Sequence, residues 1–425
     1  MKTRTTSGAI RKAILAALVF LVASGDDAEA KQRLYRVVKA PPGRPYSHVI
    51  KLRIGPFDVP ATEDREVCQW IELPYLDDLT SCVREKPGAA ETCGLSILGY
   101  QVRLGGGTSH HFIVWAYEGT ADGAAQFPPG VQDSKACLDF GPADSLRTRQ
   151  VAGVQTRRVK VLLPDGLGQQ VRAFTGGDGT PKGIGLILNS HYIGDGKPAK
   201  GYATVKLFVA RPGVIRAYGK LIFDVIASAF IDVPPGTTGT TQGDWQVGGL
   251  AIPVAAAGVP PENDACVLVL STHMHKRGVR FATELVDASG GQPLYETTDY
   301  QHPPLYTFAP AKLMKRGMRF HYECTHDNGV TKPVKLGCEL EPGVPPGTPL
   351  YKVFLDTGKF DGSARSCTAD ADCAGIGTGR CVPARLVFGF TGNDEMCILP
   401  GTYYDAIPGA PPGRECDLSL LPPLR

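Results

Sequence analysis

The fold is indicated by the stretch Val267-Leu-Val-Leu-Ser-Thr-His273-Met-His275-Lys-Arg-Gly278-Val-Arg-Phe281. It joins an apolar run to a glycine and a second strand-like run, which is the pattern of two short β-strands and a turn. Side chains at positions i and i+2 of a strand point to the same face, so His273 and His275 would direct two imidazoles at one point. Neutral imidazole is a ligand for copper, zinc, iron and nickel. A half-buried strand end with two solvated histidines explains the same residues.

Short apolar runs between turn residues recur along the whole chain. Its 425 residues include 51 glycines and 35 prolines, and no long helical periodicity is present. Many short strands separated by Gly/Pro turns are typical of β-sandwiches and barrels. We therefore expect an all-β protein with strands near residues 49–54, 112–117, 158–163, 184–188, 203–209, 221–227, 266–270, 279–286, 318–323 and 385–390.

The first 30 residues have the features of a secretory signal peptide. Four basic residues precede the apolar run Ala13–Ala23, and Ala28-Glu29-Ala30 is a cleavage signal. The apolar run is too short to span a bilayer, and no later stretch is long and apolar enough to do so. Cleavage after Ala30 leaves about 395 residues with a net charge of +2, which gives no electrostatic attraction to nucleic acid. We expect a secreted protein, periplasmic or extracellular, with no membrane span and no nucleic-acid partner.

The twelve cysteines predict a disulfide-bonded protein in two parts. An even number behind a signal peptide indicates disulfides in an oxidising compartment. Four cysteines precede residue 140 and eight follow residue 265, with a junction near Ala210-Arg-Pro-Gly213. The length also suits two domains, which we place at 31–212 and 213–425, with a Cys-rich insertion at 338–385. In that insertion Asp370 and Asp372 suggest either a calcium site or, as the favoured interpretation, a plain disulfide loop.

Three more histidines lie at the ends of apolar strands, and Met396 lies beside a cysteine after an acidic turn. His110 and His111 follow Gly105-Gly-Gly; because neighbouring residues of a strand face opposite ways, both can reach one ion only if the strand starts or bulges there. His191 ends another apolar run. Met396 either fills the core or, as a ligand, offers a soft thioether that favours Cu(I). Each of these residues alone is a weak signal.

Taken in order, these motifs resemble those of the copper type II, ascorbate-dependent monooxygenases, which include the peptidylglycine α-hydroxylating monooxygenases and dopamine β-monooxygenases. Four motifs carry the resemblance: His110-His111 before an apolar strand, Ser190-His191-Tyr192, His-x-His-x-x-Gly from His273 to Gly278, and Glu395-Met396-Cys397 followed by Tyr403-Tyr404. The resemblance extends from about Pro60 to Cys416, which is nearly the whole mature chain.

The resemblance implies two consecutive jelly-roll-like β-sandwich domains with one copper ion in each. His110, His111 and His191 would bind the copper of the N-terminal domain, which receives electrons singly from ascorbate. His273, His275 and Met396 would bind the copper of the C-terminal domain, where O₂ meets the substrate, and would be the catalytic residues. An sp³ carbon of a small organic substrate would be hydroxylated, and the second oxygen atom would leave as water.

The resemblance also implies the disulfides Cys324–Cys397 and Cys266–Cys416. The chain departs from the family at two positions near the histidine pair. Ser271 replaces an arginine that holds the substrate carboxylate in the peptide-amidating members, and Lys276 replaces a frequent histidine. A glycine-extended peptide is therefore a poor candidate substrate.

Two other functions fit part of the sequence. The first is a secreted copper-binding protein of the same fold that has lost turnover. The second is a cupin-type enzyme with one metal bound by His273 and His275; such sites usually include a glutamate a few residues later, whereas Glu284 is nine residues away. The cupin interpretation leaves the other three motifs unexplained.

Overall fold

The computed structural model describes residues 34–61, 65–76, 78–84, 91–106, 109–133, 147–192, 196–249, 261–339, 366–375, 377–389 and 394–424. The expected signal peptide, Cys137 and much of the expected Cys-rich insertion lie outside these ranges.

The first half of the chain forms two antiparallel sheets. In spatial order the larger sheet contains β1 (Tyr35–Lys39), β2 (Tyr46–Val59), β13 (Ala199–Ala210), β5 (Thr92–Gly105), β10 (Leu167–Arg172) and the parallel β14 (Ala217–Tyr218), while β4 (Ser81–Val83) and β9 (Arg158–Leu162) also pair with β5. The second contains β7 (Val131–Asp133), β3 (Arg65–Pro74), β12 (Pro181–Tyr192), β6 (Ser109–Tyr117) and β8 (Thr148–Val154), with β11 (Phe174–Thr175) paired to β12. The short helix α2 (Ala121–Ala124) follows β6.

These two sheets enclose one apolar core. Strand β2 shows the required alternation, because Ile50, Leu52 and Ile54 are buried and the residues between them are more exposed. They pack in one cluster with Leu186 of β12 and Leu207 of β13. Each such side chain stabilises the fold by about 1.5–3 kcal/mol through burial. The central strand β12, which ends in His191, is buried along nearly its whole length and is therefore a rigid support.

The second half forms another pair of sheets. One contains β15 (Lys220–Asp224), β26 (Leu399–Asp405), β18 (Ala265–Leu270) and β21 (Tyr306–Met314), and the other β17 (Thr237–Gln246), β22 (Arg319–Asn328), β19 (Gly278–Asp287) and β20 (Gly290–Thr297). Two small ribbons pair β16 (Asp232–Val233) with β25 (Leu386–Val387) and β23 (Leu336–Cys338) with β24 (Cys381–Pro383). The described residues of this half also include three short 3₁₀ helices: η3 (Ile226–Phe230), η5 (Asp370–Cys373) and η6 (Leu418–Leu420).

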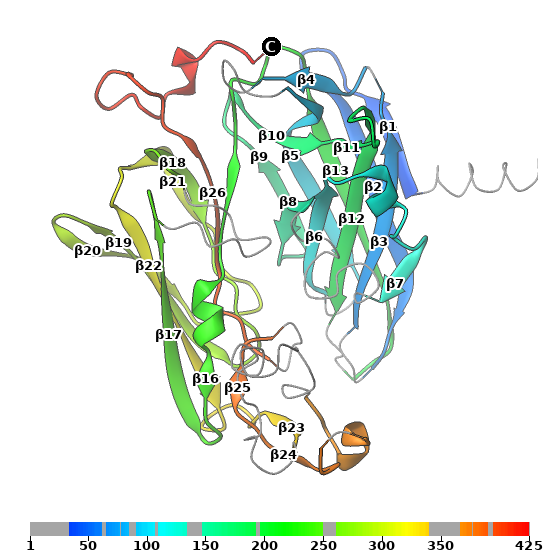
Figure 1. Ribbon diagram of the computed structural model, residues 1–425, viewed down its shortest axis with the longest axis vertical. Helices are drawn as coiled ribbons and strands as arrows, with labels where there is room; N and C mark the ends of the chain where they lie inside the picture. The colour runs from blue at the N-terminus through cyan, green and yellow to red at the C-terminus, as the bar shows by residue number, and fades with distance from the viewer. Residues whose placement is uncertain are drawn as a thin grey trace, which may run out of the picture.

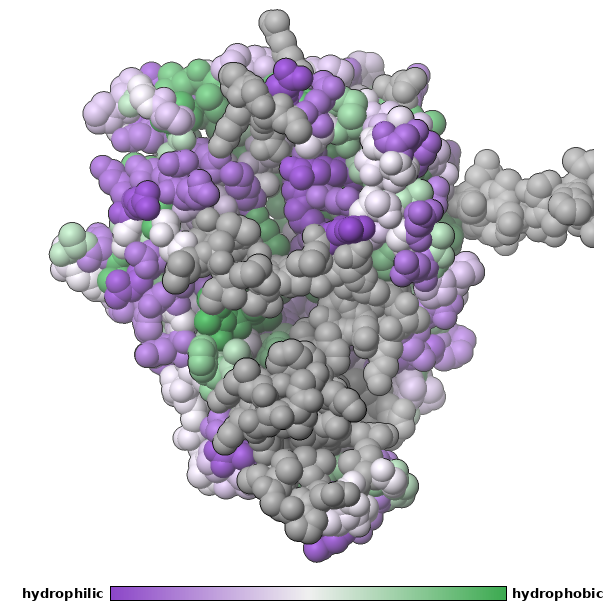
Figure 2. All heavy atoms as spheres, viewed as in Figure 1, coloured by the Kyte–Doolittle hydropathy of each residue, from purple (hydrophilic) through white to green (hydrophobic). Residues whose placement is uncertain are grey.

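The protein is therefore an all-β molecule of two β-sandwiches, as the sequence predicts. Trp245, Phe281 and Phe320 lie in the core of the second sandwich. The two sandwiches stand side by side (Figure 1). Their described outer surface is mainly hydrophilic in the same view (Figure 2). No helix among the described residues is long and apolar enough to cross a membrane.

Two expected strands are wrong in their extent. The run 221–227 is a strand only to Asp224, because the Asp224 carboxylate accepts the backbone N–H of Ile226 at 3.0 Å and the chain turns into η3. In the described part of the run 385–390, which ends at residue 389, only the two residues of β25 form a strand. In both places apolar residues fill the core without extending a sheet, which a pattern of hydrophobicity alone does not distinguish.

Disulfides staple both sandwiches. The bonds are Cys82–Cys93, Cys266–Cys416, Cys324–Cys397, Cys338–Cys373 and Cys367–Cys381, and Cys68 is disulfide-bonded as well. The two pairings implied by the resemblance are thus confirmed. In the Cys-rich segment, Asp370 and Asp372 accept backbone N–H groups of Cys381 and Thr368, which matches the plain disulfide loop.

The C-terminal segment returns to the residues just before β14, the short strand that pairs with β10 of the first sandwich. The backbone N–H of Leu424 donates to the carbonyl of Ile215 at 2.7 Å, and the Arg216 guanidinium donates to the carbonyl of Leu421. Leu167 of β10 shares an apolar cluster with Cys266 of β18 and with other residues of the second half. The two halves of the chain are therefore in direct contact near the C-terminal segment, through apolar side chains and hydrogen bonds.

Candidate metal centre

Three of the predicted histidines meet at the end of β6 and β12. His111 pairs with His191, and the next pair along the ladder is Ser109 with Tyr192. His110 is therefore the extra residue of a β-bulge, which turns a side chain that would otherwise face away. This is the irregular backbone that the sequence requires for both neighbouring histidines to reach one point.

The spacing of the three rings suits one metal ion. Their centroids are 5.4 Å apart for His110 and His111, 5.3 Å for His110 and His191, and 5.0 Å for His111 and His191. A metal–nitrogen bond of about 2 Å puts a ring centroid about 3.1 Å from the ion, so rings about 90–120° apart have centroids about 4.4–5.4 Å from one another. Among the described side chains, however, three ligand atoms all within 4.8 Å of one another occur in a cysteine group and not in these imidazoles. The rings would have to turn slightly to close on an ion.

The environment keeps His111 neutral. Burial, followed by the charges of His191, His110, His273 and His275, holds the pKa of His111 well below 6.5. Its Nδ1 atom is buried and has no hydrogen-bond partner within the described part of the chain. Buried polar atoms nearly always have a partner, and a neutral imidazole nitrogen is a good copper ligand. The residues of this group therefore fit the metal that the resemblance implies.

The second predicted group lies in the second sandwich, just beyond β18. His273 and Ile398 form an isolated antiparallel bridge with two backbone hydrogen bonds of 3.1 Å. This bridge brings the chain segment of Met396, two residues before Ile398, next to the segment of His273 and His275. The ring centroids of His273 and His275 are 5.2 Å apart, and Met396 is buried. The structure thus brings the two imidazoles together, and it places Met396 on the chain segment that pairs with theirs.

A buried carboxylate fixes the loop that carries the second group. Glu395 accepts the backbone N–H of His275 at 2.9 Å and that of Arg277 at 2.6 Å. Burial raises the pKa of Glu395 to about 7, although these hydrogen bonds and the Arg277 charge lower it in part. The Nδ1 atom of His275 lies 3.0 Å from the carbonyl oxygen of Asp394. These bonds orient the His275 ring so that Nε2 is the nitrogen for an ion.

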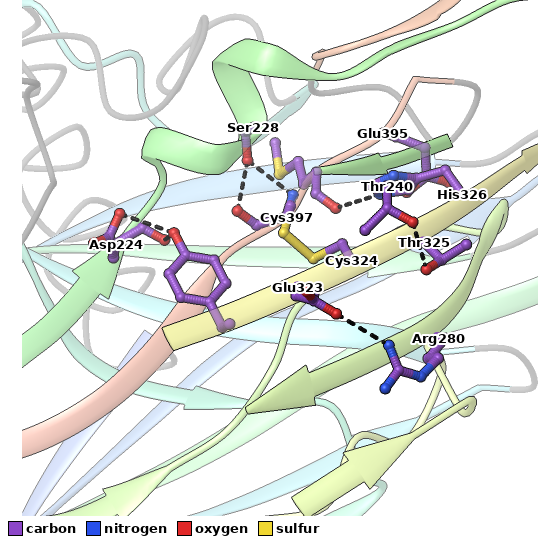
Figure 3. Close-up of a disulfide and its surroundings, with 12 residues drawn as sticks. Asp224, Ser228, Thr240, Arg280, Glu323, Cys324, Thr325, His326, Glu395 and Cys397 are labelled. Carbon is purple, nitrogen blue, oxygen red and sulfur yellow. Dashed lines mark hydrogen bonds and ion pairs between the residues drawn. A yellow bond between two sulfur atoms is a disulfide. The ribbon is translucent and has the colours of Figure 1, made fainter. Parts of the chain in front are cut away.

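His326 is a member of this centre that the sequence does not single out. It is fully buried, its Nε2 lies 3.3 Å from the Met396 carbonyl oxygen and 3.7 Å from Oε2 of Glu395, and burial lowers its pKa to about 4. Figure 3 shows it beside the Cys324–Cys397 disulfide. One feature of the sequence could have indicated His326. It lies two residues after Cys324, and the expected disulfide partner of Cys324 is Cys397, which directly follows Met396.

The two groups adjoin each other across the sandwiches. The ring centroids of His111 and His273 are 6.3 Å apart. Gln155, which follows β8, has its Nε2 atom 3.1 Å from Nδ1 of His273. Tyr300 of the second sandwich lies 6.2 Å from His110, measured between ring centroids. Nothing in the sequence motifs indicates Gln155 or Tyr300, because both depend on how the sandwiches face each other.

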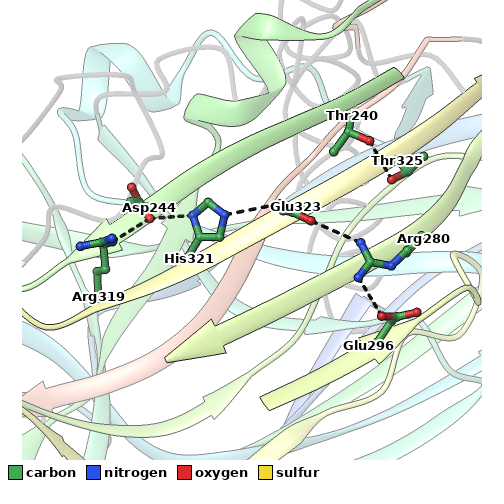
Figure 4. A network of polar contacts seen from close by, with 8 residues as sticks. All are labelled: Thr240, Asp244, Arg280, Glu296, Arg319, His321, Glu323 and Thr325. Atoms are coloured by element: carbon green, nitrogen blue, oxygen red, sulfur yellow. Dashed lines mark hydrogen bonds and ion pairs between the residues drawn. The ribbon is translucent and has the colours of Figure 1, made fainter. Parts of the chain in front are cut away.

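Other candidate ligands lie elsewhere or are already bonded. His321 belongs to a polar network with Asp244 and Glu323 (Figure 4). Glu284 pairs with His321 across β19 and β22, so both point to the outer face, away from the core side of Thr283 and Leu285. Glu284 therefore does not complete a cupin-type site with the histidine pair. The sulfurs of Cys338, Cys367 and Cys373 lie together but belong to disulfides and are not thiolate ligands.

Comparisons with known proteins add no assignment. No model of a protein family matches the chain, and no curated protein matches its sequence. Among solved structures, the crystal structure of the coconut allergen cocosin aligns with 9% identity over 85% of this chain and 96% of that chain, at a TM-score of 0.13. A TM-score this low carries no argument about fold or function. The residues of the site are therefore the basis for any functional proposal.

Proposed function

We propose that the protein is a secreted dicopper monooxygenase that uses ascorbate and O₂ to hydroxylate an sp³ carbon of a small organic substrate. One observation carries the proposal: a group of three imidazoles on β6 and β12 adjoins a second pair of imidazoles, beside the segment that carries Met396. The disulfides support an oxidising compartment such as the periplasm or the extracellular space.

The first group suits electron transfer. It consists of His110, His111 and His191, and all three side chains come from the ends of two paired strands. Three neutral nitrogen ligands bear no charge of their own and accept either copper valence, so a change of valence requires little rearrangement of the protein. This group would receive electrons one at a time from ascorbate.

The second group suits the reaction with O₂. His273 and His275 offer two nitrogens and Met396 a soft thioether, which stabilises the reduced ion. Copper bound here would supply one-electron redox chemistry and the activation of O₂. In the balanced reaction, a substrate C–H becomes C–OH, the second oxygen atom leaves as water, and two electrons from ascorbate and two protons are consumed.

The surroundings of Ser271 favour a substrate without a carboxylate at this position. The Ser271 hydroxyl donates to the carbonyl of Pro304 at 3.1 Å, and the Tyr295 hydroxyl donates to the Ser271 carbonyl at 2.5 Å. These contacts engage the serine with neutral partners and provide no cation to hold a carboxylate. They support a neutral or aromatic small molecule over a glycine-extended peptide.

A copper-binding protein without turnover is the second candidate. The observation that favours it is the close contact of the two groups, because Gln155 and Tyr300 occupy part of the space between the sandwiches. Copper binding would then serve storage, transport or protection. Both candidates require two ions per chain, so metal content alone does not distinguish them.

Turnover distinguishes the two functions. The mature, copper-loaded protein should consume O₂ only when ascorbate and a substrate are both present. A screen of phenethylamines, small hydrophobic molecules and peptides, analysed by mass spectrometry, should find a product heavier by one oxygen atom that derives from ¹⁸O₂. Two bound coppers without any ascorbate-dependent product across these classes would support the binding protein instead.

A further inference from the structure

Gln155 connects the first sandwich to the metal group of the second. It is separated from His273 by 118 residues, and its side-chain amide lies 3.1 Å from Nδ1 of that histidine. Gln155 directly follows β8, which pairs with the bulged strand β6, so the amide is held by the same sheet that carries His110 and His111. The contact therefore joins the sheet that carries the first centre to a histidine of the second centre.

The two histidines of the second group, His273 and His275, differ in the group that contacts Nδ1. Nδ1 of His275 lies against the carbonyl oxygen of Asp394, which can only accept, so this nitrogen carries the proton. Nδ1 of His273 lies against an amide, which can donate through nitrogen or accept through oxygen. In both rings Nε2 is then the nitrogen that faces an ion.

We propose that Gln155 is a positioning residue that fixes the tautomer of His273 both with and without a bound metal. In the structure, Nε2 of Gln155 lies toward Nδ1 of His273 and donates to it, which places the ring proton on Nε2. When Nε2 of His273 binds copper, the proton moves to Nδ1, and the amide turns over so that Oε1 accepts it. This inference rests on the proposed copper site.

The choice of glutamine follows from this double role. A carboxylate at position 155 could accept from Nδ1–H of the metal-bound ring but could not donate to the metal-free ring. A methionine of similar length could do neither. A separate contact joins Tyr300 of the second sandwich to His110 of the first group.

The test compares the variants Gln155→Met, Gln155→Ala and Gln155→Glu with the wild-type protein, each as the full mature chain. Copper(II) affinity of each group is measured by stepwise chelator competition, with His191→Ala used to assign the second-group phase, and the Cu(II) EPR spectrum is recorded. Loss of an outer partner of a metal-bound histidine typically weakens metal binding 10–100-fold. We therefore expect Gln155→Met and Gln155→Ala to weaken the second group 10–100-fold with an altered EPR spectrum, and Gln155→Glu to stay within about threefold of the wild type or to bind more tightly.

The controls separate this inference from the proposed function. Gln242 is exposed on β17, and Gln242→Met should leave both affinities unchanged. A wild-type chain that binds fewer than two coppers would overturn the proposed function itself. Two coppers in the wild type with an unchanged second-group affinity in Gln155→Met and Gln155→Ala would overturn the role of Gln155. Equal weakening in Gln155→Glu and Gln155→Met would also overturn it, because only packing would then matter.

Discussion

His111 and His191 face each other directly across β6 and β12, with ring centroids 5.0 Å apart. In an antiparallel sheet, paired residues project to the same face, so the ladder itself aligns these two rings. The bulge at His110 adds the third ring from the neighbouring position. A shift of one residue in this register would turn the rings to opposite faces. The site therefore depends on the pairing of two buried strands and not on flexible loops.

Metal stoichiometry is the first test of this arrangement. His191→Ala should remove one copper per chain and His273→Ala the other, because the two histidines belong to different sandwiches. Elemental analysis after dialysis, with the quantity of folded protein checked by circular dichroism, measures the result. The exposed His302→Ala is the matched control and should retain two coppers. If His191→Ala and His273→Ala emptied the same site, the division into two groups would be wrong.

The sequence predicts much of this fold because alternation and turn residues are local signals. The strands that end in His191 and precede His273 are continuous apolar runs, and both are strands in the structure. From the sequence it also follows that His110 and His111 can bind the same ion only if their strand starts or bulges there. It does not state the register of β6 against β12, which only tertiary pairing decides.

The residues that the sequence fails to identify act through the packing of distant segments. His326 meets Met396 because a disulfide joins the neighbouring Cys324 and Cys397. Gln155 meets His273 because the two sandwiches face each other. Neither residue has a local spacing that indicates a ligand or an outer partner. Glu395 lies inside a recognised motif, yet its role as an acceptor for two backbone N–H groups depends on the loop after His273.

The Cys324–Cys397 disulfide should stabilise both the fold and the position of Met396. It links residues 73 apart in sequence, and the chain-entropy model assigns a loop of this length about 4 kcal/mol of stabilisation. The double variant Cys324→Ser, Cys397→Ser should therefore unfold at lower denaturant concentration and lose copper from the second group first. The control is the double variant Cys367→Ser, Cys381→Ser. It removes a disulfide that links residues only 14 apart in sequence, and it should leave the copper sites intact. Equal copper loss in both variants would contradict this prediction.

Asp327 should make the stability of the second sandwich depend on acid pH. Its buried carboxylate accepts the backbone N–H groups of Gly329, Val330 and Thr331 and the Thr331 hydroxyl. Burial alone would raise its pKa, but these hydrogen bonds outweigh burial and lower the pKa to about 2. Because the folded-state pKa lies below the unfolded value, the stabilisation is present above pH 4 and is lost as pH falls through 2.

The Asp327→Asn variant measures that contribution. It should be less stable than the wild type at pH 6 by roughly 2 kcal/mol, and the difference should shrink toward pH 2, where the wild-type carboxylate is also protonated. Urea unfolding of the metal-free protein at several pH values gives the comparison. Asp165→Asn, at an exposed turn, is the control. A stability difference that does not change between pH 6 and pH 2 would show that the Asp327 charge is not responsible.

Met396 gives the most direct test of the chemistry. If its sulfur is a ligand, it should bind Cu(I) more firmly than Cu(II), because a soft thioether prefers the softer ion. Met396→Ile keeps similar bulk and should change stability by about 1 kcal/mol. Copper in the first group and its reduction by ascorbate should survive, because His110, His111 and His191 are untouched. Product formation should collapse, and the sulfur scattering in the X-ray absorption spectrum of the Cu(I) form should disappear.

A matched variant separates ligation from packing at this position. Met314 is also buried, in the core of the second sandwich, but it lies on β21, outside the histidine groups. Met314→Ile should therefore cost similar stability while it retains the sulfur scattering and the turnover. If Met396→Ile instead behaved like Met314→Ile in both measurements, Met396 would be core filling beside Cys397. The soft ligand on which the proposed O₂ chemistry depends would then be absent, and a copper-binding protein without turnover would become the better explanation.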